Sequence, residues 1–124
     1  MAMAKILVVD DSEVIRAQLT KDLTGAGHEV VEAYDGLNGI DQLKSHDDIK
    51  LIICDVNMPE MDGLTMCETI HLDASIPQLP IVMLTTQSNV DMKTKSKEFG
   101  VVAWIIKPHK PAVLINGVNK ILSL

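Results

Sequence analysis

Aromatic side chains are scarce in this chain, with one Trp, one Tyr and one Phe among 124 residues. Its core must therefore be built from Ile, Leu, Val, Met and Ala. Basic residues are outnumbered, and the net charge of −6 argues against a nucleic-acid-binding surface, because duplex binding depends on neutralising phosphates with Lys and Arg. An anionic membrane or a strongly acidic partner is disfavoured for the same electrostatic reason.

Several further features are missing, and each absence excludes a class of protein. The two cysteines, Cys54 and Cys67, form neither a disulfide framework nor a metal-ligand spacing. No apolar run approaches the roughly 20 residues needed to span a bilayer, and the N-terminus lacks the pattern of a signal peptide. We therefore expect a cytoplasmic protein with no membrane insertion.

The composition is that of one ordinary folded domain. The apolar fraction of 47% and the charged fraction of 23% are close to the globular average, and 124 residues are enough to bury a single core. No linker, repeat or low-complexity tract interrupts the pattern. We predict a single domain over residues 1–124, without an output domain.

Short apolar runs alternate with segments of helical spacing. The runs lie at residues 6–9, 30–31, 51–54, 81–84 and 101–106. Several are continuous, which predicts strands buried on both faces, as in a parallel sheet covered by helices. Between the runs, apolar residues recur every three or four positions, as Ile15, Leu19 and Leu23 do, and this spacing predicts helices. The order predicts an α/β fold of five β-α units, with helices on both faces of the sheet.

Side chains that carry chemistry follow four of the five predicted strands. Asp10 and Asp11 follow the first strand, Asp55 the third, Thr85 the fourth and Lys107 the fifth. We expect these groups to meet, because ligands of open α/β sheets bind at the carboxyl ends of the strands. Three adjacent carboxylates repel one another and need a cation, and oxygen ligands favour Mg²⁺ or a similar hard ion. The hydroxyl and the ammonium would then hold an anion such as a phosphoryl group.

Each of these residues has an ordinary alternative when it is taken alone. Asp10 and Asp11 could cap a helix and offset its dipole, and Asp55 could be a turn residue. Thr85 could be a plain strand residue, and Lys107 a solvated charge. Their joint placement after four strands is what favours a site.

The segment 55–63, which reads Asp-Val-Asn-Met-Pro-Glu-Met-Asp-Gly, is the strongest local motif. Taken with the acid pair at 10–11, Thr85 and the Lys-Pro pair at 107–108, it resembles the receiver domains of two-component response regulators over essentially the whole chain. The resemblance implies a flavodoxin-like (βα)5 doubly wound parallel sheet in three α/β/α layers, with strand order 2-1-3-4-5.

Carried over residue by residue, the resemblance implies that Asp55 is the phospho-acceptor and one of the metal ligands. Asp11 would bind Mg²⁺ directly, Asp10 mainly through water, and Asn57 through its backbone carbonyl. These assignments make Mg²⁺ the implied cofactor. They also imply that the chain is not an enzyme beyond its own phosphorylation and dephosphorylation.

The resemblance also implies which residues hold the phosphoryl group and report on it. Thr85 would donate its hydroxyl to one phosphoryl oxygen, and Lys107 would pair with another. Trp104 lies where the family carries a switch aromatic that changes rotamer as the threonine moves toward the phosphate. The alternative for Trp104 is an apolar strand residue packed in the core. As a switch it would couple the site to a face formed by the fourth helix, fifth strand and fifth helix.

Residues 84–89 and 104–108 are most similar to the chemotaxis subgroup of CheY-like proteins. This similarity implies a monomeric signalling switch in a chemotaxis phosphorelay. Its phosphate would come from a sensor histidine kinase or, less efficiently, from a small phosphodonor. Its target would be a protein such as a flagellar motor switch or another effector.

Some positions depart from the family pattern. Thr86 stands where a small residue is usual, and it could narrow access to the phosphate. His109 stands where phenylalanine is common, and we expect an exposed loop histidine rather than a catalytic base. Asn57 and Gln87 occupy positions that tune dephosphorylation in the family.

Three rival functions are weighed against this one. A metal-dependent phosphohydrolase with an Asp nucleophile would need a second acid two residues after Asp55, where the chain has Asn57. A nucleotide-binding protein would need a glycine-rich loop after the first strand, and none is present. A constitutive scaffold receiver would not need the full set of site residues that this chain carries.

Overall fold

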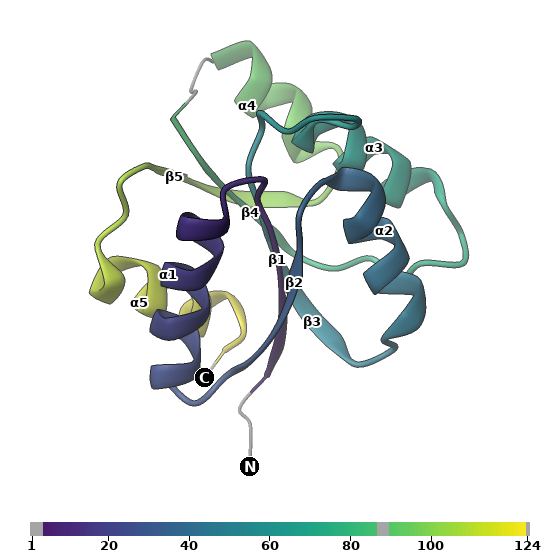
Figure 1. Cartoon of the computed structure of the whole chain (residues 1–124). Helices are drawn as coiled ribbons and strands as arrows, with labels where there is room; N and C mark the ends of the chain where they lie inside the picture. The colour runs from purple at the N-terminus through teal and green to yellow at the C-terminus, as the bar shows by residue number, and fades with distance from the viewer. Residues whose placement is uncertain (1–3, 87–89, 124) are drawn as a thin grey trace.

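The structure is a computed structural model of the chain, and it describes residues 4–86 and 90–123. A parallel five-stranded sheet lies between two layers of helices (Figure 1). Its strands are β1 (Lys5–Val9), β2 (Glu29–Ala33), β3 (Ile49–Cys54), β4 (Ile81–Thr85) and β5 (Val101–Ile106). Its helices are α1 (Glu13–Gly25), α2 (Gly36–Ser45), α3 (Gly63–Leu72), α4 (Val90–Lys97) and α5 (Pro111–Ile121). The strand order β2-β1-β3-β4-β5 confirms the predicted flavodoxin-like fold.

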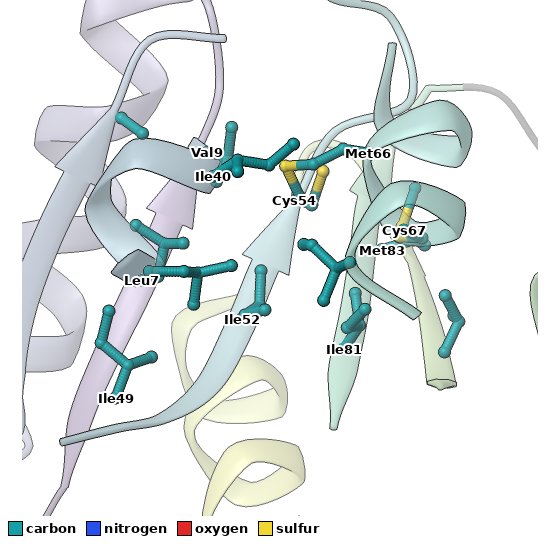
Figure 2. Packing of buried hydrophobic residues seen from close by; sticks show 14 of the residues in the cluster. Leu7, Val9, Ile40, Ile49, Ile52, Cys54, Met66, Cys67, Ile81 and Met83 are labelled. Carbon is teal, nitrogen blue, oxygen red and sulfur yellow. The ribbon is translucent and has the colours of Figure 1, made fainter. Parts of the chain in front are cut away.

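The hydrophobic core is divided in two by the sheet. Successive residues of a strand point to opposite faces. In β3, Ile52 and Cys54 face α2 and α3, whereas Leu51 and Ile53 face α1 and α5. Figure 2 shows the first of these clusters, in which strand side chains pack against Met66 and its neighbours on α3. The continuous apolar runs of the central strands are therefore buried on both faces, as predicted.

The strand at the β5 edge departs from that prediction. It pairs only with β4 in the sheet order, and Val102 and Ile106 are 58% and 48% exposed. The prediction of burial on both faces is therefore wrong for this strand. A run of branched residues shows that a strand is apolar, but it does not show whether other elements cover both of its faces.

Side-chain caps start three of the helices close to the carboxyl edge of the sheet. The Ser12 hydroxyl accepts a hydrogen bond from the Ile15 N–H at 3.3 Å, and Asp62 accepts one from the Thr65 N–H at 2.8 Å. Asp35 caps α2 in the same way. The longest helix, α1, has 13 residues. Within residues 4–86 and 90–123, no helix has both the length and the apolar character needed to cross a membrane.

Candidate functional site

Three carboxylates from separate strand ends lie together at the carboxyl edge of the sheet. Asp10 and Asp11 follow β1, and Asp55 follows β3, which is its neighbour in the sheet. One ligand oxygen from each carboxylate lies within 4.8 Å of the others. Asp10 and Asp55 are buried, whereas Asp11 is exposed. The structure thus brings together the three acids that the strand-end pattern placed at this edge.

Lys107 bridges the two buried carboxylates from the end of β5. Its Nζ donates to Asp10 Oδ2 at 2.7 Å and to Asp55 Oδ2 at 2.8 Å. Burial by itself would lower the pKa of Lys107, but the hydrogen bonds to Asp10 and Asp55 outweigh it, and the pKa is raised. The ammonium therefore stays protonated at neutral pH and offsets part of the negative charge of the cluster.

Thr85 is the last residue of β4, and it pairs in the sheet with Ile106, the residue before Lys107. It is fully buried at the end of β4, and its carbonyl accepts a hydrogen bond from the Lys107 N–H at 3.0 Å. This backbone contact fixes the strand ends of Thr85 and Lys107 against each other. The next residue, Thr86, is exposed. Gln87, the other residue expected to tune dephosphorylation, lies outside the described residues.

Arg16 holds the acid pair in place, and the sequence analysis did not predict this role. Its Nη1 donates to the Asp10 carbonyl at 2.6 Å, and its Nε pairs with Glu32 of β2 at 3.3 Å. The Ser12 N–H donates to Asp10 Oδ1 at 2.9 Å. The backbone and one carboxylate oxygen of Asp10 are thus fixed from α1 and β2. A basic residue in the second turn of a helix that follows an acid pair is the signal that could have found it.

The loop from β3 to α3 closes tightly around Asp55. The Asp55 N–H donates to the Val9 carbonyl at 3.1 Å, and the Gly63 N–H donates to the Val56 carbonyl at 2.8 Å. A Cβ atom at Gly63 would overlap the carbonyl oxygen of Asp55, so this position requires glycine. Glu60, at the tip of the loop, has a φ of 66°, in the left-handed region.

A cavity of about 560 Å³ opens beside the carboxylates. It is lined by Asp11, Asn57, Met58, Pro59 and Asp62. The Asn57 N–H makes a long contact of 3.4 Å with Asp55 Oδ1. A ligand that enters this cavity meets a carboxylate and an asparagine at its wall.

The donor set fits a hard divalent cation. Three carboxylates can each supply one oxygen to a shared point, and the adjoining cavity leaves room for retained water. Mg²⁺ prefers oxygen ligands and keeps several waters when it binds to proteins. Asp10, Asp11 and Asp55 are therefore suited to hold this ion, with Asn57 at the wall of the same cavity.

Trp104 joins the β5 edge to α4. It lies opposite Met83 in the sheet register and is half-buried against the cluster that faces α2 and α3. Its Nε1 donates to the Ser96 hydroxyl at 3.2 Å. The residue is therefore packed, as its alternative interpretation expected, and it also carries a polar link to a helix. The switch role of Trp104 stays a prediction.

The expectation of an exposed histidine at position 109 is wrong. The side chain of His109 is 7% exposed, and its Nε2 lies 2.8 Å from Oδ2 of Asp22 on α1, a side chain that is 9% exposed. The two residues are 87 positions apart. The sequence analysis missed this pair because no local pattern connects a loop residue to an acid so distant along the chain.

Comparison with known proteins agrees with this geometry. Residues 6–119 match the response regulator receiver domain family. A curated chemotaxis protein CheY homolog from Campylobacter jejuni is 36% identical over 120 residues, which cover 96% of this chain and 92% of that protein. The structure of Vibrio cholerae CheY4 has a TM-score of 0.89 and 35% identity, covering 97% of this chain and 99% of that one. A chain of the CheX–CheY–BeF₃–Mg²⁺ complex from Borrelia burgdorferi has a TM-score of 0.89 and 25% identity, covering 98% and 90%.

Proposed function

The chain belongs to the response regulator receiver domain family, homologous to the CheY chemotaxis switches that phosphorylation controls, and we propose that Asp55 is its phospho-acceptor. The observation that carries this proposal is the 2.8 Å contact between Lys107 Nζ and Asp55 Oδ2. An ammonium at that distance also stands beside any phosphoryl group bonded to the carboxylate. It would neutralise charge where the transfer places it.

The reaction that we propose is an in-line displacement at phosphorus. An oxygen of Asp55 attacks the phosphoryl group of a phosphohistidine on a kinase, whose other ring nitrogen is protonated. A P–O bond forms and the P–N bond breaks, with its electron pair passing to the ring nitrogen, so that neutral imidazole leaves. In this scheme the Thr85 hydroxyl and the Lys107 ammonium each hold one phosphoryl oxygen.

Receiver domains generally bind Mg²⁺ at an acidic pocket, and the acids described above match that donor set. When bound, this ion would neutralise charge on the phosphoryl oxygens. We assign Asp11, Asp55 and the Asn57 carbonyl as direct ligands, and Asp10 as a ligand through water. The contacts of Asp10 support its indirect role. Lys107 binds one oxygen of each buried acid, but the other oxygen of Asp10 accepts from the Ser12 N–H at 2.9 Å, whereas that of Asp55 has only the longer 3.4 Å contact with the Asn57 N–H.

CheY-like receiver domains are signalling proteins rather than enzymes in the usual sense. The proposal includes two slow reactions of the chain on itself. In the first, an oxygen of Asp55 attacks the phosphorus of a small phosphodonor such as acetyl phosphate, the P–O bond to the acetyl group breaks, and acetate leaves. In the second, a water oxygen attacks phosphorus and the acyl phosphate is cleaved, which returns the carboxylate and releases inorganic phosphate. In this proposal Thr86 and Asn57, which are both exposed, modulate the access of that water.

The output surface in this proposal is the face formed by α4, β5 and α5. Four large apolar side chains are exposed on these elements: Val90, Val102, Ile106 and Val113. Exposed apolar side chains on neighbouring elements favour protein docking. We propose that a chemotaxis-type histidine kinase phosphorylates the chain as a monomer, and that a protein effector such as a flagellar motor switch reads this face. A Borrelia burgdorferi relative has been solved together with CheX and a beryllofluoride–magnesium group.

Intact-mass measurement after treatment with acetyl phosphate and Mg²⁺ tests the phospho-acceptor assignment. The unaltered chain should gain the mass of one phosphoryl group, and Asp55→Asn should gain none. Asp62→Asn, which alters another acid on the cavity wall, is the matched control and should still be modified. A chain that never gains phosphate, or an Asp55→Asn variant that still does, would refute the assignment.

A further inference from the structure

The pair formed by His109 and Asp22 lies outside the site and is nearly removed from solvent. Their side chains are 7% and 9% exposed, and the His109 Nε2 lies 2.8 Å from Asp22 Oδ2. A carboxylate can only accept a hydrogen bond, so Nε2 carries the proton and donates it. The second oxygen of Asp22 accepts from Gln18 Nε2 at 2.9 Å. Both oxygens of this carboxylate are therefore engaged.

His109 is the inward-facing residue of the connection between β5 and α5. Its neighbours Pro108 and Lys110 are exposed. The connection starts at Lys107, whose N–H is fixed to the Thr85 carbonyl at 3.0 Å. A charge-assisted hydrogen bond is stronger than a neutral one. The contact of His109 with Asp22 therefore anchors this connection two residues beyond the ammonium-bearing lysine.

The helix α1 holds both sides of the site through two of its residues. Near its start, Arg16 donates to the backbone carbonyl of Asp10, and the carboxylate of the same residue accepts from Lys107. Further along, Asp22 binds the connection that carries Lys107. One rigid helix thus sets the position of the acid pair and of the lysine that reaches across to it.

We propose that His109 is a positioning residue for Lys107. Its hydrogen bond to Asp22 holds the start of the connection against α1, and so keeps the Lys107 ammonium where a phosphoryl group on Asp55 would meet it. This inference rests on the proposed phospho-acceptor function. It concerns the phosphoryl group rather than the metal, because Lys107 approaches the carboxylates as a cation and has no lone pair for Mg²⁺.

If His109 positions Lys107, its loss should affect the phosphoryl mimic and not Mg²⁺. If His109 only stabilises the fold, its loss should affect both ligands. A misplaced Lys107 should weaken the binding of a phosphoryl mimic. It should not weaken Mg²⁺ binding, because a looser ammonium competes less with the metal for Asp10 and Asp55. A general loss of order at the site would weaken both ligands together.

The test is calorimetric titration of the full chain, first with Mg²⁺ and then with beryllofluoride at saturating Mg²⁺. His109→Leu and Asp22→Ala should each raise the dissociation constant for beryllofluoride about tenfold, and leave that for Mg²⁺ unchanged or lower. The double variant should be no worse than either single variant. His109→Gln, which keeps an N–H donor near the place of Nε2, should recover most of the affinity.

Asp41→Ala is the matched control, because it removes the same charge from an exposed position on α2. It should leave both titrations unchanged. Asp22→Leu keeps the approximate size of the side chain but removes both acceptor oxygens, and it carries the same test if His109→Leu does not fold. Unchanged beryllofluoride binding in folded variants, or equal loss for both ligands, would overturn the positioning role. An unaltered chain that fails to bind beryllofluoride at all would instead refute the proposed function.

Discussion

The indole nitrogen of Trp104 donates a hydrogen bond of 3.2 Å to the hydroxyl of Ser96, and this contact ties β5 to α4. Ser96 is fully buried, and its hydroxyl donates in turn to the Lys93 carbonyl at 2.9 Å. It is the buried residue of α4 among those that the structure describes. Among the described residues, α4 contributes few buried side chains to the core, and a helix with few such contacts can shift with little loss of packing, which suits a switching element.

Binding of a phosphoryl mimic should change the fluorescence of Trp104. Trp104 lies opposite Met83, two residues before Thr85 on β4, so a movement of Thr85 should alter the surroundings of the indole. The chain has one tryptophan, so the signal has a single source. The measurement is a titration with beryllofluoride in the presence of Mg²⁺. Asp55→Asn should show no change. An unaltered spectrum at ligand concentrations that calorimetry shows to be saturating would exclude the switch role.

The substitution Gly63→Ala should destabilise the fold by about 3 kcal/mol or more, because the new Cβ would overlap the Asp55 carbonyl, which is backbone and cannot rotate away. Gly117→Ala is the matched control. It lies in α5 with open space around its Cβ position, and it should stabilise the fold by about 0.5–1 kcal/mol. Urea unfolding measures both changes. A Gly63→Ala variant as stable as the unaltered chain would show that the loop is not closed as described.

The substitution Arg16→Gln should weaken Mg²⁺ binding about tenfold, because residues that orient metal ligands from behind contribute to affinity on this scale. Charge alone predicts the opposite result, since removing a cation near three acids favours a metal. Lys21→Gln removes an exposed cation from the same helix and is the control. Calorimetric titration with Mg²⁺ distinguishes a loss of ligand orientation from the effect of charge alone. Tighter binding in Arg16→Gln would show that its contact with Asp10 does not orient the acid pair.

The substitution Lys107→Ala should make the metal-free protein less stable by about 2 kcal/mol, because it leaves two buried carboxylates without their counter-charge. Mg²⁺ should restore much of this loss, since a ligand that binds the native state stabilises it. Thermal unfolding with Mg²⁺ and with chelator measures both effects. A variant whose melting temperature does not depend on Mg²⁺ would contradict the metal site.

The two cysteines should not react with thiol reagents at pH 8 in the native protein. Burial raises the pKa of the Cys67 thiol to about 12 and that of the Cys54 thiol well above its usual range, so the reactive thiolate is scarce. Both should react once urea unfolds the chain.

The same shifts predict a pH dependence of stability. A thiol whose pKa is raised in the native state contributes to the free energy of unfolding. For Cys67 this contribution is fully present below 9.0, the pKa of the unfolded thiol, and it is lost as the pH rises toward about 12. Urea unfolding from pH 8 to 11 should show this decline. A shallower fall of the unfolding free energy with pH in Cys67→Ala would identify that thiol as the source. Rapid reaction of the native protein with thiol reagents would contradict the burial of both cysteines.

The residues that sequence reasoning could place are those fixed by the sheet. Asp10, Asp55 and Lys107 follow strands directly, and parallel strands bring their carboxyl ends to one edge whatever the helices do. Arg16 and His109 act through side chains that reach across the fold. Their partners depend on how the helices pack against the sheet and each other. No periodic pattern in the sequence indicates which side chains this packing brings together.

The exposed faces were hard to predict for a similar reason. The apolar run that forms β5 resembles the runs of the central strands in composition, but its place at the edge of the sheet comes from the crossover connections. Only the resemblance to a family supplied the strand order. Physical reasoning from the residues supplied the layers, the helix positions and the chemistry of the strand ends.

Gly63 packs directly against the Asp55 carbonyl, and the helices α3 and α4 differ in how much side-chain burial holds them to the sheet. The helix α3 is held to the acid-bearing strand by the close approach of Gly63 to the Asp55 carbonyl and by the buried side chains of Met66, Cys67 and Ile70. The helix α4 has one buried residue among those described, Ser96, and it packs through Met92 and through the hydrogen bond of that serine to Trp104. A partner that docks on α3 would therefore meet a surface fixed to the acid-bearing strand, whereas one that docks on α4 would meet a helix with a single buried residue among those described.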